Sequence, residues 1–159
     1  MKQTKYEIEK NELIRIIDIA IKSLKTFTPL ECPQEQVRDF IKFYISEKES
    51  IITPKPQFKN LCSLRQTKND VLIYFQEGHG KSVNYFWEEI NSNKINIERK
   101  NTLKKVLKKS KISNTQEYDS VIDLMVPYYQ TGMISELDFE NLKSYIGKFE
   151  NKNQRISTK

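Results

Sequence analysis

The sequence predicts an all-α protein, an irregular bundle of six or seven helices. Apolar residues recur at i, i+3 and i+4 along the 159 residues, whereas strict alternation of apolar and polar residues is scarce. Only four glycines interrupt the chain, so few positions favour a turn over a helix. Aromatic residues make up 11% of the chain and argue against disorder. A chain of this length can bury a core without a disulfide or a metal.

Two helices are predicted in residues 1–50, which we expect to form an N-terminal helical hairpin packed on the remainder. The first helix covers about Tyr6 to Leu24. The second begins near Pro33, because proline fits the first turn of a helix, where its missing N–H is not needed. A hinge is expected over Ser50 to Pro56, since its prolines disfavour helix in the residues before them. The side chains predicted to be buried are Leu13, Ile16, Ile17, Ala20 and Leu24 in the first helix and Val37, Phe40, Ile41 and Tyr44 in the second.

Residues 57–150 are predicted to form a helical core that includes a basic helix. Short helices are expected over Phe58 to Leu64 and over Val71 to Glu77. Thr67 resembles the start of a capping box for the second of these, and Gly78 is placed to end it in a left-handed conformation. The next helix is predicted to bury Val83, Phe86, Trp87 and Ile90.

Three further helices are predicted towards the C-terminus. A basic helix covers about Arg99 to Lys109, and the next helix is capped by Asn114 or Thr115 and bent or ended by Pro127. The last helix is capped by Ser135 and Asp138, and residues 151–159 are predicted to be a disordered tail. The side chains expected to be buried are Tyr118, Val121, Ile122, Met125 and Tyr129, followed by Leu142, Tyr145, Ile146 and Phe149.

Positive charge is concentrated in one segment, residues 94–111. This segment holds eight basic residues and one acid, a local charge of +7, whereas the whole chain has a net charge of +6. On a helical wheel its lysines lie opposite Leu103, Val106 and Leu107, and no acid of the segment shares the lysine face. One concentrated positive surface is a candidate site for an anionic partner. The candidate binding residues are Lys94, Arg99, Lys100, Lys104, Lys105, Lys108, Lys109 and Lys111.

The composition of this segment limits what it can recognise. Lysine is a point charge without the planar fork that reads guanine or clamps phosphate, and Arg99 is the only arginine in the segment. No aromatic residue interleaves with the lysines to stack on bases. One hypothesis is therefore a non-enzymatic protein that binds RNA or DNA backbone, mostly without sequence preference. The other is an adaptor or inhibitor that binds an acidic or nucleic-acid-binding protein with the same surface, such as a phage or mobile-element antagonist. A solvated lysine face remains the third possibility.

Two motif interpretations are weaker. Residues 99–130 could form a helix-turn-helix, but Glu117, Asp119 and Asp123 would then face a groove lined by phosphates. Residues 78–82 read Gly-His-Gly-Lys-Ser, as at the end of a phosphate-binding loop, but the motif needs a glycine where Phe75 stands. Helix, turn and helix explain the same residues, so we expect no nucleotide binding.

The sequence offers little for catalysis. Its one histidine lacks a partner cysteine at a plausible spacing, and its carboxylates mostly alternate with lysines. We expect no enzyme activity, catalytic residue, metal, cofactor or small-molecule substrate, and a cytoplasmic protein without a membrane segment. Cys32 and Cys62 are predicted to be reduced thiols in or near the core. Outward-facing aromatics, for which Tyr85, Tyr128 and Tyr129 are candidates, could anchor a protein interface.

Overall fold

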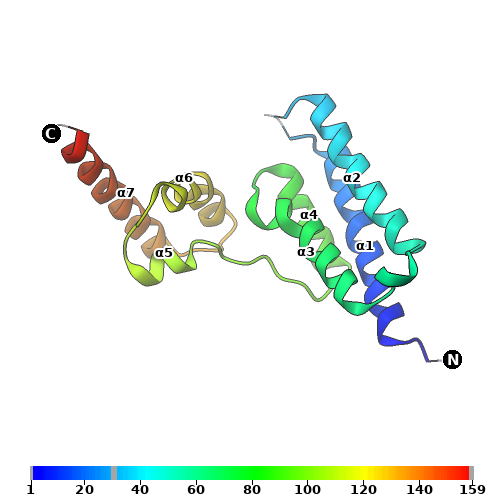
Figure 1. The fold of residues 1–159 in the computed structure, drawn as a ribbon. Helices are drawn as coiled ribbons and strands as arrows, with labels where there is room; N and C mark the ends of the chain where they lie inside the picture. The colour runs from blue at the N-terminus through cyan, green and yellow to red at the C-terminus, as the bar shows by residue number, and fades with distance from the viewer. Residues whose placement is uncertain (1, 30–31, 158–159) are drawn as a thin grey trace. The chain divides into compact units, whose positions relative to one another are not determined.

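The computed structural model describes residues 2–29 and 32–157, and within these ranges all regular structure is helical (Figure 1). The prediction of an all-α fold with helices packed against one another is confirmed. The chain divides into two compact units, Met1–Arg99 (unit 1) and Lys100–Lys159 (unit 2). The helices of unit 1 are α1 (Lys5–Thr26), α2 (Gln34–Ile52), the 3₁₀ turn η1 (Pro56–Phe58), α3 (Leu61–Glu77) and α4 (Lys81–Ser92), and those of unit 2 are α5 (Lys104–Lys109), α6 (Thr115–Gln130) and α7 (Glu136–Ser157).

The core of unit 1 is built around α1, which packs against α2, α3 and α4. Helix α1 starts with a capping box, in which Thr4 accepts a hydrogen bond from the backbone N–H of Glu7 and the Glu7 carboxylate accepts one from the N–H of Thr4. Burial of each large apolar side chain in this core contributes roughly 1.5–3 kcal/mol. The buried side chains include Leu13, Ile16, Ile17, Ala20, Leu24, Tyr44, Val71, Phe75, Val83, Phe86 and Ile90, so the predicted buried faces of the first helix and of α4 are confirmed.

Two polar side chains in this core are satisfied by backbone carbonyls. The Tyr44 hydroxyl donates to the carbonyl of Val71 at 2.9 Å, and the indole N–H of Trp87 donates to the carbonyl of Phe75 at 2.8 Å. A buried donor without an acceptor would cost about 1–3 kcal/mol. These two bonds therefore fix α2 on α3 and α3 on α4 at defined positions.

The third helix differs from the prediction. Helix α3 runs without a break from Leu61 to Glu77, and its N-cap is Asn60, whose side chain accepts from the N–H of Ser63 at 2.9 Å. The predicted capping residue Thr67 lies inside this helix. The two short predicted helices are one because Leu64 and Val71 are buried on the same face, which carries the helix past the polar residues between them.

Gly78 ends α3 as predicted, but not in the left-handed conformation. Its φ is −82° and its ψ is 177°, which is extended backbone. Glycine is required for another reason, since a Cβ at this position would lie 2.5 Å from the carbonyl oxygen of Tyr74. The positive φ of the turn belongs to Gly80, at 102°, immediately before α4.

The expected hinge over Ser50 to Pro56 lies inside unit 1. Tyr44 before it and Leu64 after it belong to the same core cluster, so α1 and α2 share one core with the helices that follow. The division between the two units comes at Arg99 and Lys100. The expected tail also differs, because residues 151–157 continue α7, while residues 158 and 159 lie outside the described part of the chain.

Unit 2 is formed by α5, α6 and α7, with α6 and α7 packed together. Asn114 caps α6 as predicted, accepting from the N–H of Glu117 at 2.8 Å. The Ser135 hydroxyl accepts from the N–H of Asp138, and the Asp138 carboxylate accepts from the N–H of Ser135. Pro127 lies inside α6, which continues to Gln130. The buried residues of the unit are Leu103, Val106, Ile112, Val121, Leu124, Met125, Tyr128, Ile134, Leu142 and Tyr145.

The buried face of α6 is rotated from the predicted one. Leu124 and Tyr128 are buried, whereas Ile122 is 45% exposed and Tyr129 is 42% exposed. Residues 121, 124, 125 and 128 follow i, i+3, i+4 and i+7 and fit one helix face, which excludes position 122. The prediction that Ile122 is buried is wrong. Tyr129 is both in the predicted buried set and a candidate for an outward-facing aromatic, and it is exposed, whereas the other candidate on α6, Tyr128, is buried.

None of the helices within the described ranges combines the length and hydrophobicity that a membrane span requires.

Candidate nucleic-acid interface

The eight candidate binding residues are divided between the two units. Lys94 and Arg99 belong to unit 1, and the other six lie in unit 2 between Lys100 and Lys111. The predicted basic helix is also shorter than expected, since α5 begins at Lys104 and not at Arg99. The candidate interface of unit 2 is therefore a surface of six lysines, called here the lysine surface: Lys100, Lys104, Lys105, Lys108, Lys109 and Lys111.

The segment before the lysine surface, residues 95–99, has no regular secondary structure, and unit 1 binds its backbone and side chains. Ile95 is buried in the core of unit 1, and the Gln76 side chain donates to the carbonyl of Glu98 at 2.9 Å. The Arg99 guanidinium donates to the carbonyl of Gly78 at 2.7 Å and is half-buried. The one arginine of the basic segment therefore contacts its own fold and does not belong to the lysine surface.

Helix α5 is held on unit 2 by local hydrogen bonds and by apolar anchors. The Asn101 side chain accepts from the N–H of Leu103 at 3.0 Å, which closes a turn directly before the helix. The Thr102 hydroxyl is 3.0 Å from the hydroxyl of Tyr128 on α6. Leu103 and Val106 are 1% and 3% exposed. This packing fixes the orientation of a six-residue helix that would not be stable alone.

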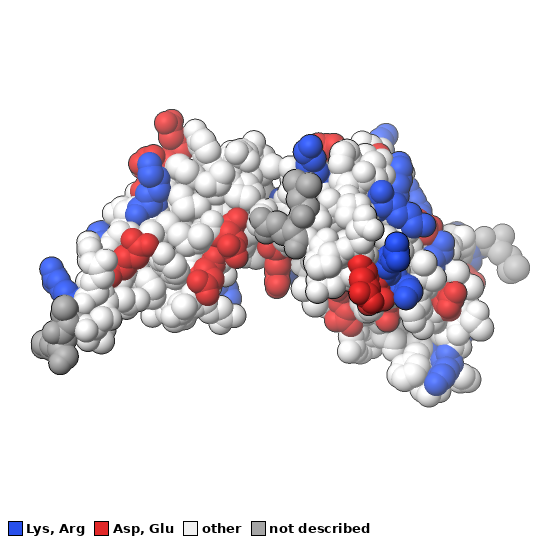
Figure 2. All heavy atoms as spheres, turned by 90° about the horizontal axis from the view of Figure 1, so that it is seen from above, with Lys and Arg blue, Asp and Glu red and all other residues white. Residues whose placement is uncertain are grey.

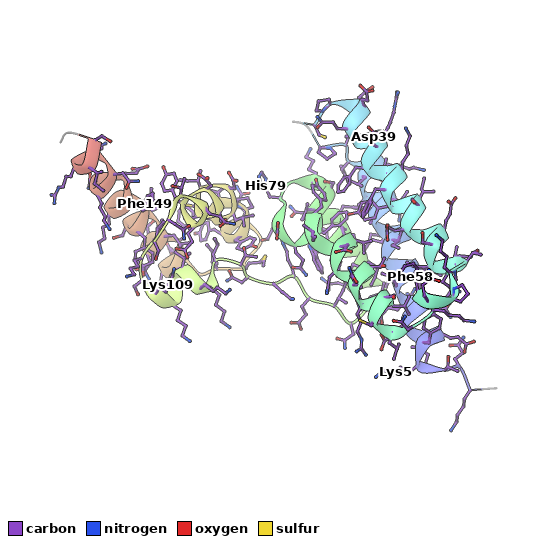
Figure 3. All side chains as sticks on the ribbon, in the orientation of Figure 1. Lys5, Asp39, Phe58, His79, Lys109 and Phe149 are labelled. Carbon is purple, nitrogen blue, oxygen red and sulfur yellow. The ribbon has the colours of Figure 1, made fainter. Side chains whose placement is uncertain are left out.

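Anchoring by Leu103 and Val106 turns the lysines of α5 outwards. The side chains extend from the short helix into solvent, as seen around the labelled Lys109 in Figure 3. Among the described residues, no carboxylate forms an ion pair with Lys104, Lys105, Lys108 or Lys111. The predicted opposition of lysines to Leu103 and Val106 is thus present in the structure, although the helix is half as long.

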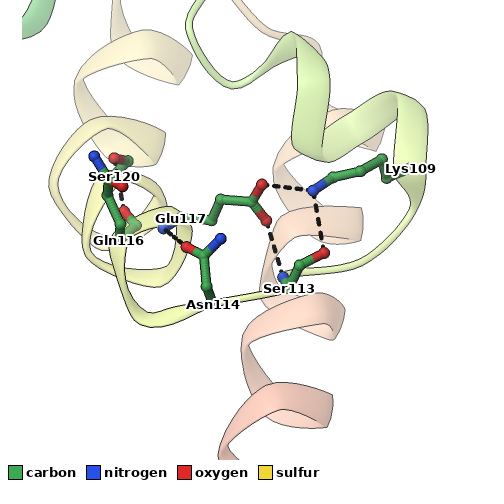
Figure 4. Close-up of polar contacts among 6 residues, drawn as sticks. All are labelled: Lys109, Ser113, Asn114, Gln116, Glu117 and Ser120. Carbon is green, nitrogen blue, oxygen red and sulfur yellow. Dashed lines mark hydrogen bonds and ion pairs between the residues drawn. The ribbon is translucent and has the colours of Figure 1, made fainter.

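Lys109 differs from its neighbours because an acid neutralises it (Figure 4). Its ammonium group forms an ion pair with Glu117 of α6 and donates to the Ser113 hydroxyl at 3.1 Å. The other carboxylate oxygen of Glu117 accepts from the N–H of Ser113 at 2.9 Å. The bond from Lys109, followed by that from the Ser113 backbone, lowers the pKa of Glu117 below its usual range. The expectation that no acid neutralises the lysine face is therefore wrong at Lys109.

The sequence held a signal for this cluster. Ser113 and Asn114 followed by Glu117 is the pattern in which an acid three residues into a helix reaches back towards the residues before it. The sequence predicts Asn114 as the cap of this helix, and Glu117 is interpreted from the sequence only as a charge that phosphate would repel. The structure shows that Glu117 ties the end of α5 to the start of α6.

The other acids of unit 2 are separated from the lysine surface in sequence. Residues 100–111 contain six lysines and no acid, whereas residues 112–142 contain six carboxylates and neither lysine nor arginine. Acidic and basic side chains are both seen on the face of the molecule drawn in Figure 2. Asp119 and Asp123 are exposed on α6, so a helix-turn-helix that placed α6 in a major groove would bring both carboxylates against phosphate.

The remaining candidate sites of the sequence lie in unit 1. In the Gly-His-Gly-Lys-Ser segment, residues 78–80 form the turn after α3, and Lys81 and Ser82 begin α4. This is the order of helix, turn and helix that was predicted in place of a phosphate-binding loop. It borders a cavity of about 540 Å³, where the Ser82 hydroxyl is 3.1 Å from the Tyr74 hydroxyl. Within the described ranges no group of three or more His, Cys, Asp or Glu residues could hold a metal ion. Cys62 is exposed on α3, contrary to the expectation of a core thiol, and Cys32 is half-buried.

Comparison with known proteins finds no matching family model, no matching curated protein and no matching solved structure.

Proposed function

We propose that this chain binds the phosphate backbone of nucleic acid through the lysine surface of unit 2, mostly without sequence preference. The observation that carries the proposal is the state of Lys104, Lys105 and Lys108. All three are exposed on a helix that is anchored from its opposite side, and none forms an ion pair within the described residues. Cations that no acid of the fold neutralises attract an anionic partner and release its counterions on binding.

The chemistry of the lysine surface favours backbone over bases. It holds no arginine, because Arg99 contacts unit 1, and therefore no planar group that could form the bidentate contact to guanine. It also holds no aromatic side chain on which a base could stack. Point charges on flexible stems bind phosphates of single and double strands alike. We therefore expect affinity that depends on salt and little on sequence.

The test is a charge reversal with a matched control in the same unit. In the variant Lys104→Glu/Lys105→Glu/Lys108→Glu, the fold should persist because these side chains are exposed and glutamate and lysine have similar helix propensity. The control Lys148→Glu/Lys152→Glu/Arg155→Glu makes the same change in net charge on exposed positions of α7. Binding to labelled duplex DNA and to single-stranded RNA is measured by fluorescence anisotropy.

We expect the α5 variant to lose most of its affinity for both nucleic acids and the α7 control to lose much less. Equal losses in the two variants would show that only net charge matters and would contradict the proposal. An absence of binding by the wild-type chain at low salt would also contradict it. A stable complex with an acidic protein that the α5 variant alone disrupts would instead support the adaptor hypothesis, in which the same lysines meet a protein.

A further inference from the structure

Helix α6 carries an apolar stripe that the described helices of unit 2 leave exposed. Ile122, Val126 and Tyr129 are 45%, 44% and 42% exposed, and they follow one another at i, i+4 and i+7. Side chains at this spacing lie along one face of a helix. Isolated apolar side chains are common on protein surfaces, but a continuous stripe of this kind is typical of a surface that binds a partner helix.

The stripe is held in a fixed orientation. The opposite face of α6 is buried through Val121, Leu124 and Tyr128, which prevents the helix from rotating to hide the exposed residues. The Tyr129 ring stacks on the ring of Phe139 of α7, with 4.7 Å between centroids. Because its residues are already ordered, the stripe loses little conformational entropy when a partner binds.

Carboxylates border this stripe on the exposed face of α6. Asp119 and Asp123 are exposed and lie three residues before Ile122 and Val126, respectively. No lysine or arginine occurs between residues 112 and 142. At the Phe139 end, the ammonium group of Lys143 is 5.6 Å from the Phe139 ring and forms an ion pair with Glu140. The segment that carries the stripe is therefore negative, and this lysine is already paired with an acid.

This charge selects among possible occupants. Nucleic acid and anionic lipid surfaces would be repelled by Asp119 and Asp123. A second copy of the stripe would bring four carboxylates to one interface without an opposing base. A basic amphipathic helix offers both an apolar face for the stripe and cations for the two aspartates. We propose that the surface formed by Asp119, Ile122, Asp123, Val126 and Tyr129 docks a basic amphipathic helix of a partner protein.

The probe for this proposal is a fluorescein-labelled peptide of leucine and lysine, arranged as an amphipathic helix of about four turns. Two control peptides are used: one with glutamate in place of every lysine, and one with the same composition in an order that gives no apolar face. Binding to the full chain is measured by fluorescence anisotropy. We expect the amphipathic basic peptide to bind and both controls to bind at least about tenfold more weakly.

Two variants assign the binding to α6. The affinity for the basic peptide should fall in each of two double variants. We expect a loss of about tenfold or more in Ile122→Asn/Val126→Asn and a smaller loss in Asp119→Asn/Asp123→Asn. Leu137→Asn, at a 71% exposed position of α7, is the matched control and should bind as the wild type does. The variant Lys104→Glu/Lys105→Glu/Lys108→Glu should also bind the peptide with at least the wild-type affinity. Peptide binding and nucleic-acid binding are thereby tested by different residues, and either proposal can fail without the other.

Three results would overturn the proposal. The first is that the glutamate or scrambled peptide binds as tightly as the amphipathic basic one. The second is full affinity of the Ile122→Asn/Val126→Asn variant, with its fold checked by circular dichroism. The third is a wild-type dimer in analytical ultracentrifugation that this variant abolishes, because the stripe would then be occupied by a second copy.

Discussion

Unit 1 and unit 2 place their charged side chains in opposite ways. Unit 1 has sixteen basic and fourteen acidic residues, and ion pairs join α1 to each of the other three α-helices of the unit. In residues 100–142 of unit 2 the charges are segregated into a lysine segment and an acidic segment, and bases occur again only from Lys143 onwards. Exposed ion pairs contribute little to stability, but they neutralise charge that could attract a partner. The total charge of a unit is therefore less informative about binding than whether its charged side chains form ion pairs within the fold. The pairs of α1 are Asp18 with Lys48, Glu9 with Arg65, Glu12 with Lys68 and Lys22 with Glu89.

The largest expected effect tests whether the two units are independent bodies. Leu142→Ala removes a fully buried side chain of unit 2 and should lower the stability of that unit by about 2–5 kcal/mol. Trp87, the only tryptophan of the chain, reports on unit 1. In denaturant unfolding followed by circular dichroism, the part of the signal that comes from unit 2 should be lost at a lower denaturant concentration than in the wild type. The midpoint of the Trp87 fluorescence transition should not change.

The reciprocal variant is Phe86→Ala, which creates a cavity in the core of unit 1 and should shift the Trp87 transition. If Leu142→Ala moved the fluorescence transition as far as the circular dichroism transition, the two units would unfold together. The comparison between them would then describe regions of one cooperative body.

An intermediate effect is expected where α6 pairs a lysine of α5, at Lys109 and Glu117. Glu117→Gln removes the charge that holds Lys109 and should destabilise unit 2 by roughly 1 kcal/mol. This is below the roughly 1.5–3 kcal/mol of a hydrogen bond to a charged group, because the pair is partly exposed to solvent. Because the pKa of Glu117 is lowered in the folded state, its contribution is present above the ordinary glutamate pKa and is lost as the pH falls through the lowered value.

The pH dependence can be measured by thermal unfolding of the wild type and of Glu117→Gln between neutral and acidic pH. The difference in melting temperature between them should be largest near neutral pH and should shrink as the solution becomes more acidic. A difference that grows on acidification would contradict the assignment of the lowered pKa to Glu117.

The smallest effect is expected for an ion pair of unit 1. Glu12→Gln breaks the 2.8 Å contact with Lys68, and both side chains are about one-third exposed. Such a pair contributes up to about 1 kcal/mol, so the Trp87 transition should shift only slightly. The variant leaves Lys68 unpaired, yet nucleic-acid binding should not rise measurably if binding depends on the lysine surface of unit 2. A clear rise would mean that any unpaired lysine of the chain suffices.

The sequence was sufficient for the fold class and for most helix positions, because apolar spacing and capping residues act locally. Asn114 and Ser135 are capping residues in the structure as their neighbours predicted. The sequence could not predict which face of α6 is buried. Ile122 and Leu124 are both apolar, and only the packing of α5 and α7 against α6 decides which of them is buried. The start of α5 could not be predicted from the sequence either. Ile95 and Arg99 contact distant residues of unit 1, and these contacts keep the preceding segment out of the helix.

The lysine surface was predicted in part. Charge counting located the segment, and the wheel placed its lysines opposite Leu103 and Val106. The pairing of Lys109 with Glu117 and the contact of Arg99 with Gly78 depend on how helices far apart in the sequence meet. Counting charges in the sequence therefore overestimates the number of cations available for binding. The structure removes Lys109 and Arg99 from that number, because each already contacts an acceptor of the fold.

The most direct test of the central claim is the salt dependence of binding to a duplex DNA of random sequence. The slope of log affinity against log salt is compared for the wild type and for Lys104→Ala/Lys105→Ala/Lys108→Ala. If each lysine neutralises one phosphate, the slope of the variant should be smaller in magnitude by about 2.7, at 0.9 per contact. The control Lys148→Ala/Lys152→Ala/Arg155→Ala should keep the wild-type slope. Identical slopes for the wild type and the α5 variant would show that these lysines do not contact the backbone and would contradict the account.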